Sequence, residues 1–193
     1  MKKINVTFIN IVLAIFSIAF ISCDDEETVK ENNFKYDGKT YKIAKGLLEN
    51  YGIGDGKDIT SVYEVDLTFL TKEFTLNELT GDISGTGSYI YLWFLSTSGT
   101  QLTTGTYTFN NTLGTAGTFY YGEIAINAAF FTDLGYIEIV AGTVKVKLND
   151  TKYEITIDCT LSDNKKLTGY YKGNLVYIDY SEVKSAKDKI RKM

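Results

Sequence analysis

The segment TVKVKLNDTKYEITIDC, residues 143–159, indicates most clearly which kind of fold this chain adopts. Apolar and polar residues alternate on both sides of a central Asn-Asp-Thr group, and a period of two is typical of strands with one buried face. The segment therefore predicts a hairpin of two strands, residues 143–148 and 152–159. Its lysines and acids are expected to face water, so that this part of the sheet has one wet face.

The same pattern recurs through most of the chain. Segments rich in Tyr, Thr, Val, Ile and Phe are separated by Gly, Asn and Asp rather than by helical stretches. Residues 88–95 differ because both alternating faces are apolar, which predicts a central strand that is covered on both sides or that displays aromatic rings on one. About ten strands are expected, from residues 34–36, 40–43, 47–51, 62–70, 88–95, 123–131, 136–140, 143–148, 152–159, 166–171 and 174–180.

Strands at this spacing, with no long helices between them, predict one all-β domain over residues 34–180. An antiparallel β-sandwich is the expected architecture, and a lipocalin-like β-barrel is the alternative. The pair Asp37-Gly38 fits such a fold, because these residue types tolerate the positive φ angles of a tight hairpin turn. With 193 residues, of which 44% are hydrophobic, the chain is long enough for one domain and too short for several.

The composition excludes several kinds of chemistry. The chain has no histidine, which removes histidine general bases, His-containing catalytic triads and His-ligated metals. Its 20 basic and 24 acidic residues give a net charge of −4, whereas sequence-independent nucleic-acid binding needs a basic surface. The sequence therefore predicts no nucleic-acid partner, no cofactor and no metal.

The first 23 residues have the features of an export signal. Lys2 and Lys3 precede an apolar stretch, residues 8–21, which is shorter than the roughly 20 residues that a helix needs to cross a bilayer. Cys23 follows almost directly, an arrangement that resembles the signal of bacterial lipoproteins, in which this cysteine is acylated and becomes the first mature residue. We expect a lipoprotein signal peptide that ends at Cys23, with fatty acyl chains such as palmitate attached there; a plain signal peptide is the alternative.

Acylation would place the protein at a membrane without a spanning helix. Two or three acyl chains hold a protein stably, whereas one chain holds it only marginally. Residues 24–33 are acidic and too polar to pack, so we expect a flexible tether. The acidic run resembles the export signal of Bacteroidota surface lipoproteins. The expected location is the cell outer membrane, lipid-anchored and surface-exposed, and the alternative is an anchor that faces the periplasm.

Candidate catalytic residues are few. Cys159 falls on the buried face of its strand, which predicts a small buried hydrophobe rather than a nucleophile. With Cys23 acylated, it also lacks a partner for an intrachain disulfide. Glu64 and Asp66 share one strand face about 7 Å apart, but alternating acids are common on wet faces. The glycine-rich residues 52–58 match no phosphate or calcium motif. We therefore expect no catalytic residue and no enzymatic activity.

Aromatic residues are the more informative excess, with 15 Tyr, 11 Phe and one Trp. In a strand, each of the doublets 120–121 and 170–171 should send one ring inward and the next outward. Exposed flat rings beside Asn and Asp are able to stack on sugar faces, although tyrosine is also a good strand former. The possible ligand-binding residues are Trp93, Tyr121 and Tyr171, and core packing is the alternative role for these rings.

The last residues, 181–193, differ in character from the domain. Apolar residues fall at helical spacing among five basic side chains. This pattern predicts a basic, partly helical tail, which is solvated or, alternatively, lies on an anionic lipid surface.

Four segments resemble sequences that recur together in Bacteroidota lipoproteins whose activity is mostly unassigned. The resemblance implies a β-rich domain behind a lipid anchor and offers no catalytic residues to carry over. The predicted function is therefore a non-enzymatic, lipid-anchored binding module for a glycan or a protein partner, and the alternative is a lipocalin-like carrier of a small apolar ligand. The four segments are FKYDGKTY (34–41), LTTGTYTF (102–109), AGTVKV (141–146) and LTGYYKG (167–173).

Overall fold

The computed structural model describes residues 30–54, 62–112, 114–131 and 135–182. Cys23 with its signal, residues 24–29 of the expected tether, residues 55–58 of the glycine-rich segment and the tail from residue 183 lie outside the described residues. The end of the expected 24–33 tether belongs to the folded domain, because Asn32 exchanges two hydrogen bonds with the backbone of Lys172 and Asn33 begins a strand. The elements of the described part are all strands, so the all-β prediction is confirmed. They are β1 (Asn33–Tyr36), β2 (Lys39–Lys42), β3 (Lys45–Ile53), β4 (Tyr63–Leu70), β5 (Phe74–Leu76), β6 (Ile83–Ser96), β7 (Gly105–Phe109), β8 (Thr118–Ala129), β9 (Tyr136–Asn149), β10 (Lys152–Leu161), β11 (Lys166–Gly173) and β12 (Val176–Asp179).

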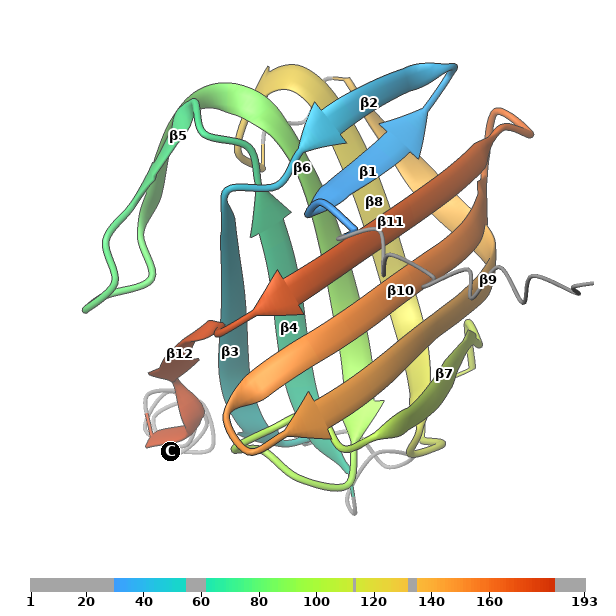
Figure 1. Ribbon diagram of the computed structural model, residues 1–193. Coiled ribbons are helices and arrows are strands. Elements are labelled where there is room, and N and C mark those ends of the chain that lie inside the picture. Colours follow the sequence, from blue (N-terminus) through green and yellow to red (C-terminus); the bar gives the residue numbers. More distant parts are fainter. Residues whose placement is uncertain (1–29, 55–61, 113, 132–134, 183–193) are drawn as a thin grey trace, which may run out of the picture.

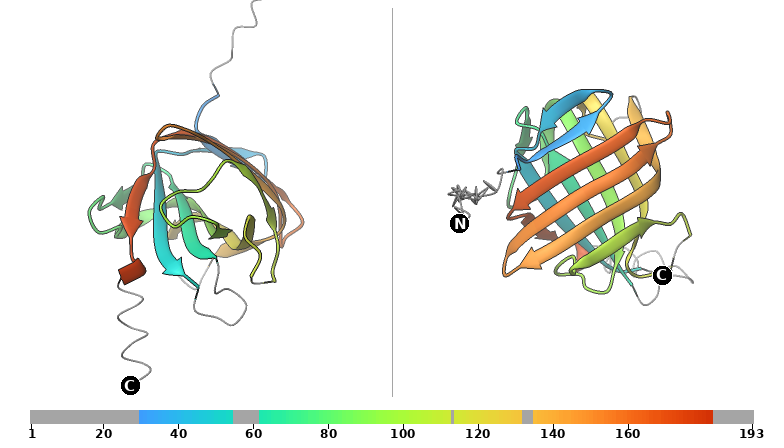
Figure 2. Two further views of the ribbon diagram at one scale, coloured as in Figure 1. Left: turned by 90° about the horizontal axis from the view of Figure 1, so that it is seen from below. Right: turned by 45° about the vertical axis from the view of Figure 1, so that its right-hand side comes forward.

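The strands form one continuous sheet in the order β12-β3-β4-β6-β8-β7-β9-β10-β11-β1-β2, with β5 beside β6 and a further pairing of β8 with β9. Most neighbours are antiparallel, but β12 pairs with β3 and β7 pairs with β8 in parallel. The predicted sandwich of two separate sheets is not confirmed. The sheet is strongly curled (Figures 1 and 2), which is compatible with the barrel alternative.

The curl places two parts of the sheet opposite each other. In Figure 1, β9, β10 and β11 run diagonally in front of β3, β4, β6 and β8. We call the first group the front layer and the second the back layer, and their outward sides the front face and the back face. The chain passes from β11 directly to β12, which joins the edge of the back layer beside β3. This connection helps to hold the curl.

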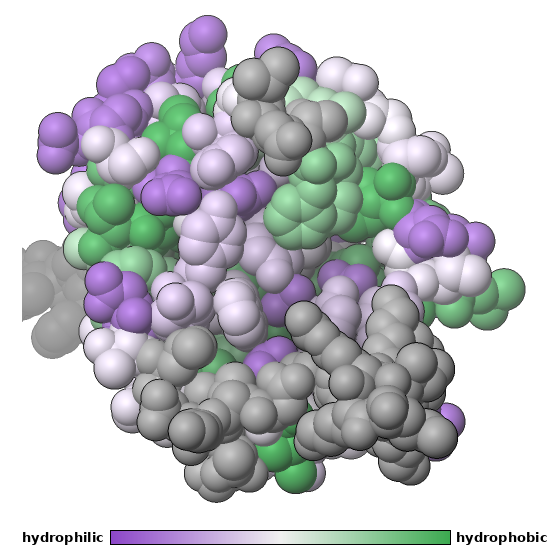
Figure 3. Space-filling model, turned by 180° about the vertical axis from the view of Figure 1, so that it is seen from behind, coloured by the Kyte–Doolittle hydropathy of each residue, from purple (hydrophilic) through white to green (hydrophobic). Residues whose placement is uncertain are grey.

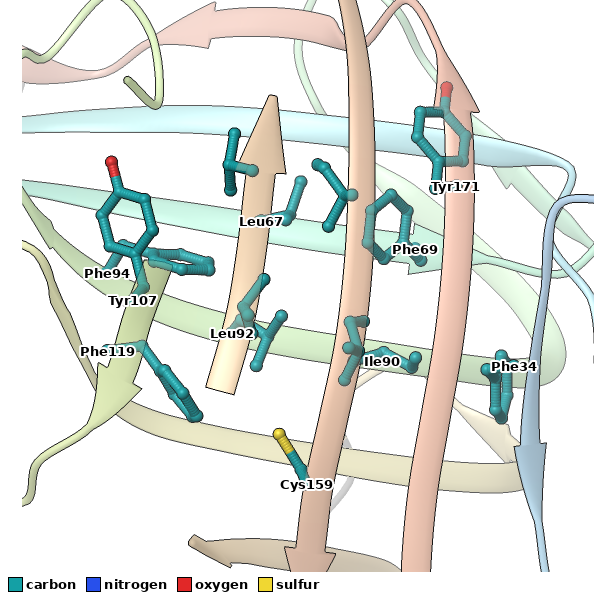
Figure 4. Close-up of a cluster of buried hydrophobic side chains, with 14 of the residues drawn as sticks. Phe34, Leu67, Phe69, Ile90, Leu92, Phe94, Tyr107, Phe119, Cys159 and Tyr171 are labelled. Atoms are coloured by element: carbon teal, nitrogen blue, oxygen red, sulfur yellow. The ribbon is translucent and has the colours of Figure 1, made fainter. Parts of the chain in front are cut away.

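The space between the layers is filled with apolar side chains. Strand alternation sends Leu67 and Phe69 of the back layer inward, where they belong to the same buried cluster as Ile155 and Ile157 of the front layer. Cys159 belongs to the same cluster and is fully buried, as predicted, and burial raises the pKa of its thiol to about 12. Figure 4 shows rings and aliphatic chains from both layers converging on one interior.

Gly142 lies at the point where β9 passes from its pairing with β8 to its pairing with β7. The sequence predicted two strands, residues 136–140 and 143–148, but β9 is one strand whose first part pairs with β8 and whose later part pairs with β7, while β10 runs alongside. Gly142 has a φ of 133°, and a Cβ at this position would lie 2.4 Å from the carbonyl oxygen of Asp158. Only glycine fits this corner without strain.

The predicted hairpins are confirmed. Asp37 and Gly38 both adopt positive φ between β1 and β2, and Asp150 does so between β9 and β10. The prediction for residues 88–95 is also confirmed, because β6 is covered on both sides. Its inward residues join the main core, and its outward residues Tyr89 and Tyr91 belong to a second apolar cluster on the back face.

Candidate functional site: the back face

Four neighbouring strands of the back layer place acidic and aromatic side chains in one row. Glu49 of β3 lies opposite Asp66 of β4, Asp66 lies opposite Trp93 of β6, and Trp93 lies opposite Tyr121 of β8. Because paired strands lie about 4.8 Å apart, this row extends over ~14 Å. Two carboxylates therefore continue directly into two rings.

A second row lies beside the first on the same face. It contains Leu47, Thr68, Tyr91 and Glu123, again one residue from each strand. Residues two apart on a strand point to the same side, so each member of this row is a neighbour of the first. Trp93 therefore lies among rings and carboxylates. Figure 3 shows this face, where pale and purple residues gather in the middle between green apolar patches.

Phenol groups hold the carboxylates of this site. Glu123 accepts hydrogen bonds from the hydroxyls of Tyr89, at 2.6 Å, and Tyr121, at 2.5 Å, one on each carboxylate oxygen. Asp66 accepts a hydrogen bond from the Tyr91 hydroxyl at 2.6 Å. A carboxylate oxygen accepts hydrogen bonds, so the phenol hydroxyls are matching donors for both carboxyl groups. In turn, burial first and the adjacent carboxylate second raise the pKa of Tyr91 and Tyr121.

Glu49 is a carboxyl group of this face whose pKa is clearly raised. Its side chain is only 9% exposed, and burial raises its pKa to about 7, although a hydrogen bond with Tyr51 acts in the opposite direction. The Tyr51 ring stacks on Tyr180, with centroids 5.4 Å apart. Glu49 therefore exchanges its proton close to neutral pH, unlike an ordinary surface glutamate.

Two of the back-face acids, Glu49 and Glu123, lie away from the ion pairs of the molecule. All ion pairs between described residues involve other side chains. Within the part of the chain that the structure describes, no group of three or more acidic or cysteine side chains is arranged to hold a metal ion. The site is an acidic surface whose carboxyl groups accept hydrogen bonds from phenols.

Aromatic side chains frame the acids. The Trp93 ring contacts Tyr120 edge-on at 5.1 Å, and Tyr91 contacts Tyr121 at 6.2 Å. Phe131, two residues after the end of β8, packs edge-on against Tyr91 at 4.7 Å and is 53% exposed. Part of this aromatic surface is therefore accessible from solvent.

Of the three predicted ligand-binding residues, the structure brings two together. Trp93 and Tyr121 lie directly opposite each other and are both partly exposed. Tyr171 was predicted to be exposed, but it lies inside the sheet, 6% exposed, against Phe69 at 4.8 Å. It shares its strand side with Leu167, and this alternation is the signal that would have placed it inward. The outward ring of that doublet is Tyr170.

The first doublet departs from simple alternation. Strand β8 has a bulge opposite Trp93 and Phe94, so Tyr120 and Tyr121 are both partly buried and partly exposed. A β-bulge places two residues opposite one and redirects a side chain. Because of it, both tyrosines of the doublet reach the surroundings of Trp93.

Glu64 and Asp66 share one strand side, as predicted, but that side is not wet. Both carboxyl groups are less than a tenth exposed, because β4 is flanked by two strands and its outward side is covered by neighbouring side chains. Sequence reasoning missed Glu49, Tyr91 and Glu123. The available signal was an acid within an otherwise apolar strand, as in Leu47-Leu48-Glu49 and Glu123-Ile124-Ala125.

The front face has a different concave surface. A shallow depression of about 380 Å³ lies over β1, β10 and β11, and Lys30 and Lys35 contribute to it. The Lys30 ammonium group lies 5.3 Å from the centre of the Tyr170 ring. The acids of this depression, Glu31 and Asp158, form ion pairs with lysines outside it. It is open to solvent, and both of its acids are more than half exposed.

Comparison of the chain with protein-family models, with curated proteins and with solved structures found no match. Within the described residues, no helix has the length and apolar character that crossing a membrane requires. The site must therefore be interpreted from its own chemistry.

Proposed function

We propose that this protein is a lipid-anchored module of the cell envelope that binds a glycan on its back face and catalyses no reaction. The observation that carries the proposal is the row in which Asp66, Trp93 and Tyr121 lie side by side on adjacent strands. Aromatic rings pack against the apolar faces of sugars, and carboxylates accept hydrogen bonds from sugar hydroxyls. This combination on one sheet face favours a glycan over an apolar ligand.

A non-enzymatic role is supported by how the acids are held. Glu123 has a phenol donor on each oxygen, an arrangement that fixes a carboxylate in place. Glycoside hydrolysis needs two carboxyl groups with different proton affinities on either side of the scissile bond. Glu49 and Asp66 are the first pair of carboxyl groups to test for glycoside hydrolysis, because they lie opposite each other on adjacent strands. Glycoside turnover that is lost in Glu49→Gln would overturn the non-enzymatic part of the proposal.

The alternative, a lipocalin-like carrier, is favoured by the barrel-like curl of the sheet. The interior argues against it, because fully buried rings such as Phe69, Phe94 and Phe119 occupy the space between the layers. A hydrophobic dye separates the two roles. Strong fluorescence of the dye with the folded protein, unchanged in Trp93→Ala, would favour the carrier, and no such signal would favour the back-face site.

The lipid anchor of the proposal rests on the sequence around Cys23. Replacement of Cys23 by Ser should move the protein from the membrane fraction to the soluble fraction, and mass spectrometry of the native chain should find acyl chains on Cys23. A Cys23→Ser variant that stays in the membrane fraction would contradict the anchor without affecting the glycan site.

Glycan binding is tested with the full-length protein on glycan arrays, followed by affinity gels. Trp93→Ala and Tyr121→Ala should each weaken binding of a positive glycan by about tenfold or more, because each removes a stacking surface. Tyr170→Ala, on the front face, is the matched control and should bind like the native chain. If no glycan binds, or if Tyr170→Ala alone loses binding, the proposal is wrong; capture of a protein instead would indicate the protein-partner form of the function.

A further inference from the structure

Two buried acidic groups of the back face have no ion-pair partner among the described residues. Glu49 and Glu123 are 9% and 3% exposed, and no ion pair among the described residues includes either of them. Removing a carboxylate from water without a cation beside it is unfavourable, and phenol donors compensate for this only in part. A positively charged ligand group would supply the cationic partner that these two carboxyl groups lack among the described residues.

A second polar group of the site is independent of these acids. Thr68 lies between Leu47 and Tyr91 in the second row and is two residues from Asp66 on the same strand side. Its hydroxyl oxygen is fully buried and has no hydrogen-bond partner among the described residues. Buried polar atoms are rarely left without a partner, and each exception calls for an explanation. Thr68 and Asp66 point to the same side of β4, so this unpartnered hydroxyl lies on the side of the sheet that carries the acids.

Aromatic rings beside carboxylates are the usual surroundings of a bound cation. Ring faces attract positive charge, and Trp does so most strongly. Trp93 lies directly opposite Asp66, and Tyr91 joins the two rows through its hydrogen bond to Asp66. A neutral sugar would gain stacking from these rings but would leave the negative charge of Glu49 without a counterpart.

We propose that the glycan recognised by the back face is an amino sugar polymer, whose protonated amine lies against Glu49 and Asp66 while its rings stack on Trp93 and Tyr121. This inference rests on the proposed glycan-binding function and narrows its ligand class. The row of about 14 Å favours a chain of linked sugars over a single small cation, because acids occupy one end of the row and rings the other.

Glucosamine oligomers of one length, with their amines free, acetylated or trimethylated, provide the test. The free and trimethylated forms carry positive charge, and the acetylated form is neutral. With the full-length protein at neutral pH and low salt, the charged oligomers should bind about tenfold or more tightly than the acetylated one, and this preference should decrease as salt is added. The trimethylated form keeps its charge at every pH, so its binding should weaken as the pH falls below about 7 and Glu49 takes up a proton.

Substitutions separate this inference from the function on which it rests. Glu49→Gln should remove the preference for charged oligomers while acetylated oligomers bind as before, and Asp66→Asn is a second variant in case Glu49→Gln folds poorly. Glu154→Gln, on the front face, should retain the preference. Equal binding of charged and acetylated oligomers would overturn the inference and leave glycan binding intact, whereas no binding of any oligomer or array glycan would overturn both.

The pH arm depends on the groups that surround Glu49. They are Tyr51 on its own strand, Asp66 on β4, Tyr91 on β6 and Tyr180 after β12. Burial raises the pKa of Tyr51, Tyr91 and Tyr180, so these phenols stay neutral through the range tested. A loss of binding near pH 7 that persists in Glu49→Gln would therefore contradict the role given to Glu49.

Discussion

The front face and the back face belong to one sheet and follow the same alternation, yet charged side chains are exposed to water on the front face and buried on the back face. On the front face, Asp158 and Lys166 form a 2.6 Å ion pair with both side chains more than half exposed. On the back face, Glu123 is almost fully buried and is held by two phenols. An outward position in a strand therefore does not determine whether a charge meets water.

The difference arises from what lies above each face. The back layer carries large rings, and β5 and β12 lie at its margins, so that an apolar cluster forms outside the sheet as well as inside. The front face carries Lys, Thr and Asp, whose short or flexible side chains leave the strands exposed. Buried hydrogen bonds to a charge contribute more to stability than exposed ion pairs do, so substitutions on the two faces should differ in effect.

The corner between the layers should tolerate change least. Gly142→Ala should lower the free energy of unfolding by about 3 kcal/mol or more, because the new Cβ would meet backbone atoms of Asp158 and Cys159 at a positive φ. Gly105→Ala on β7 is the control, since no atom lies within 4 Å of the place that its new methyl group would take, and it should change stability by less than about 1 kcal/mol. Chemical denaturation measures the free energy of unfolding of both variants. Equal losses would show that position 142 requires glycine no more than position 105 does.

Removing a back-face carboxylate should be the next largest effect. Glu123→Ala leaves the hydroxyls of Tyr89 and Tyr121 without their acceptor, at an expected cost of about 3 kcal/mol. Glu154→Ala on the front face should cost less than about 1 kcal/mol. Glu123→Gln keeps one acceptor oxygen, so its loss of stability should lie between the losses of Glu123→Ala and Glu154→Ala. If the Glu123 and Glu154 variants lose equal stability in urea, the contrast between the faces fails.

The sequence predicts strands and their inward sides well because a period of two is a local property. The hairpins at Asp37-Gly38 and at Asp150, and the burial of Cys159, all follow from neighbouring residues. The single sheet was not predictable in this way, since it depends on pairings between distant segments, such as β12 with β3 and β11 with β1. Strand β7 was missed because its five residues are supported mainly by such distant partners.

The candidate site was predictable only in part for the same reason. Trp93 and Tyr121 stand out by residue type, but Glu49 and Glu123 become part of one site only when four strands are in register. Asp66 and Asp158 occupy equivalent polar positions in alternating segments, and nothing local indicates that one is covered and the other is exposed. The covering side chains come from other strands.

The titration of Glu49 should distinguish the faces by pH. Its pKa is raised to about 7 in the folded protein, above the ordinary value of 4.5, so the folded state holds a proton that the unfolded state has released. Stability should therefore fall as the pH rises from about 4.5 to about 7, by on the order of 1–3 kcal/mol from this group. Glu49→Gln should lose this dependence, and exposed Glu78→Gln should keep it. The measurement is the denaturation midpoint as a function of pH. If the midpoints of Glu49→Gln and of the native chain changed with pH in the same way, the raised pKa could not be assigned to Glu49.

The front-face ion pair should show the smallest effect. A double-mutant cycle with Asp158→Asn and Lys166→Gln should give a coupling energy below about 1 kcal/mol, because both partners are exposed and hydration competes with their contact. The coupling should disappear at about 1 M salt, where screening acts over roughly 3 Å. The corresponding cycle on the back face, Tyr91→Phe with Asp66→Asn, should give a larger coupling that salt changes little, since water reaches that hydrogen bond poorly. Equal couplings and equal salt sensitivity in the two cycles would mean that burial does not control how strongly the charged groups of the two faces interact with their partners.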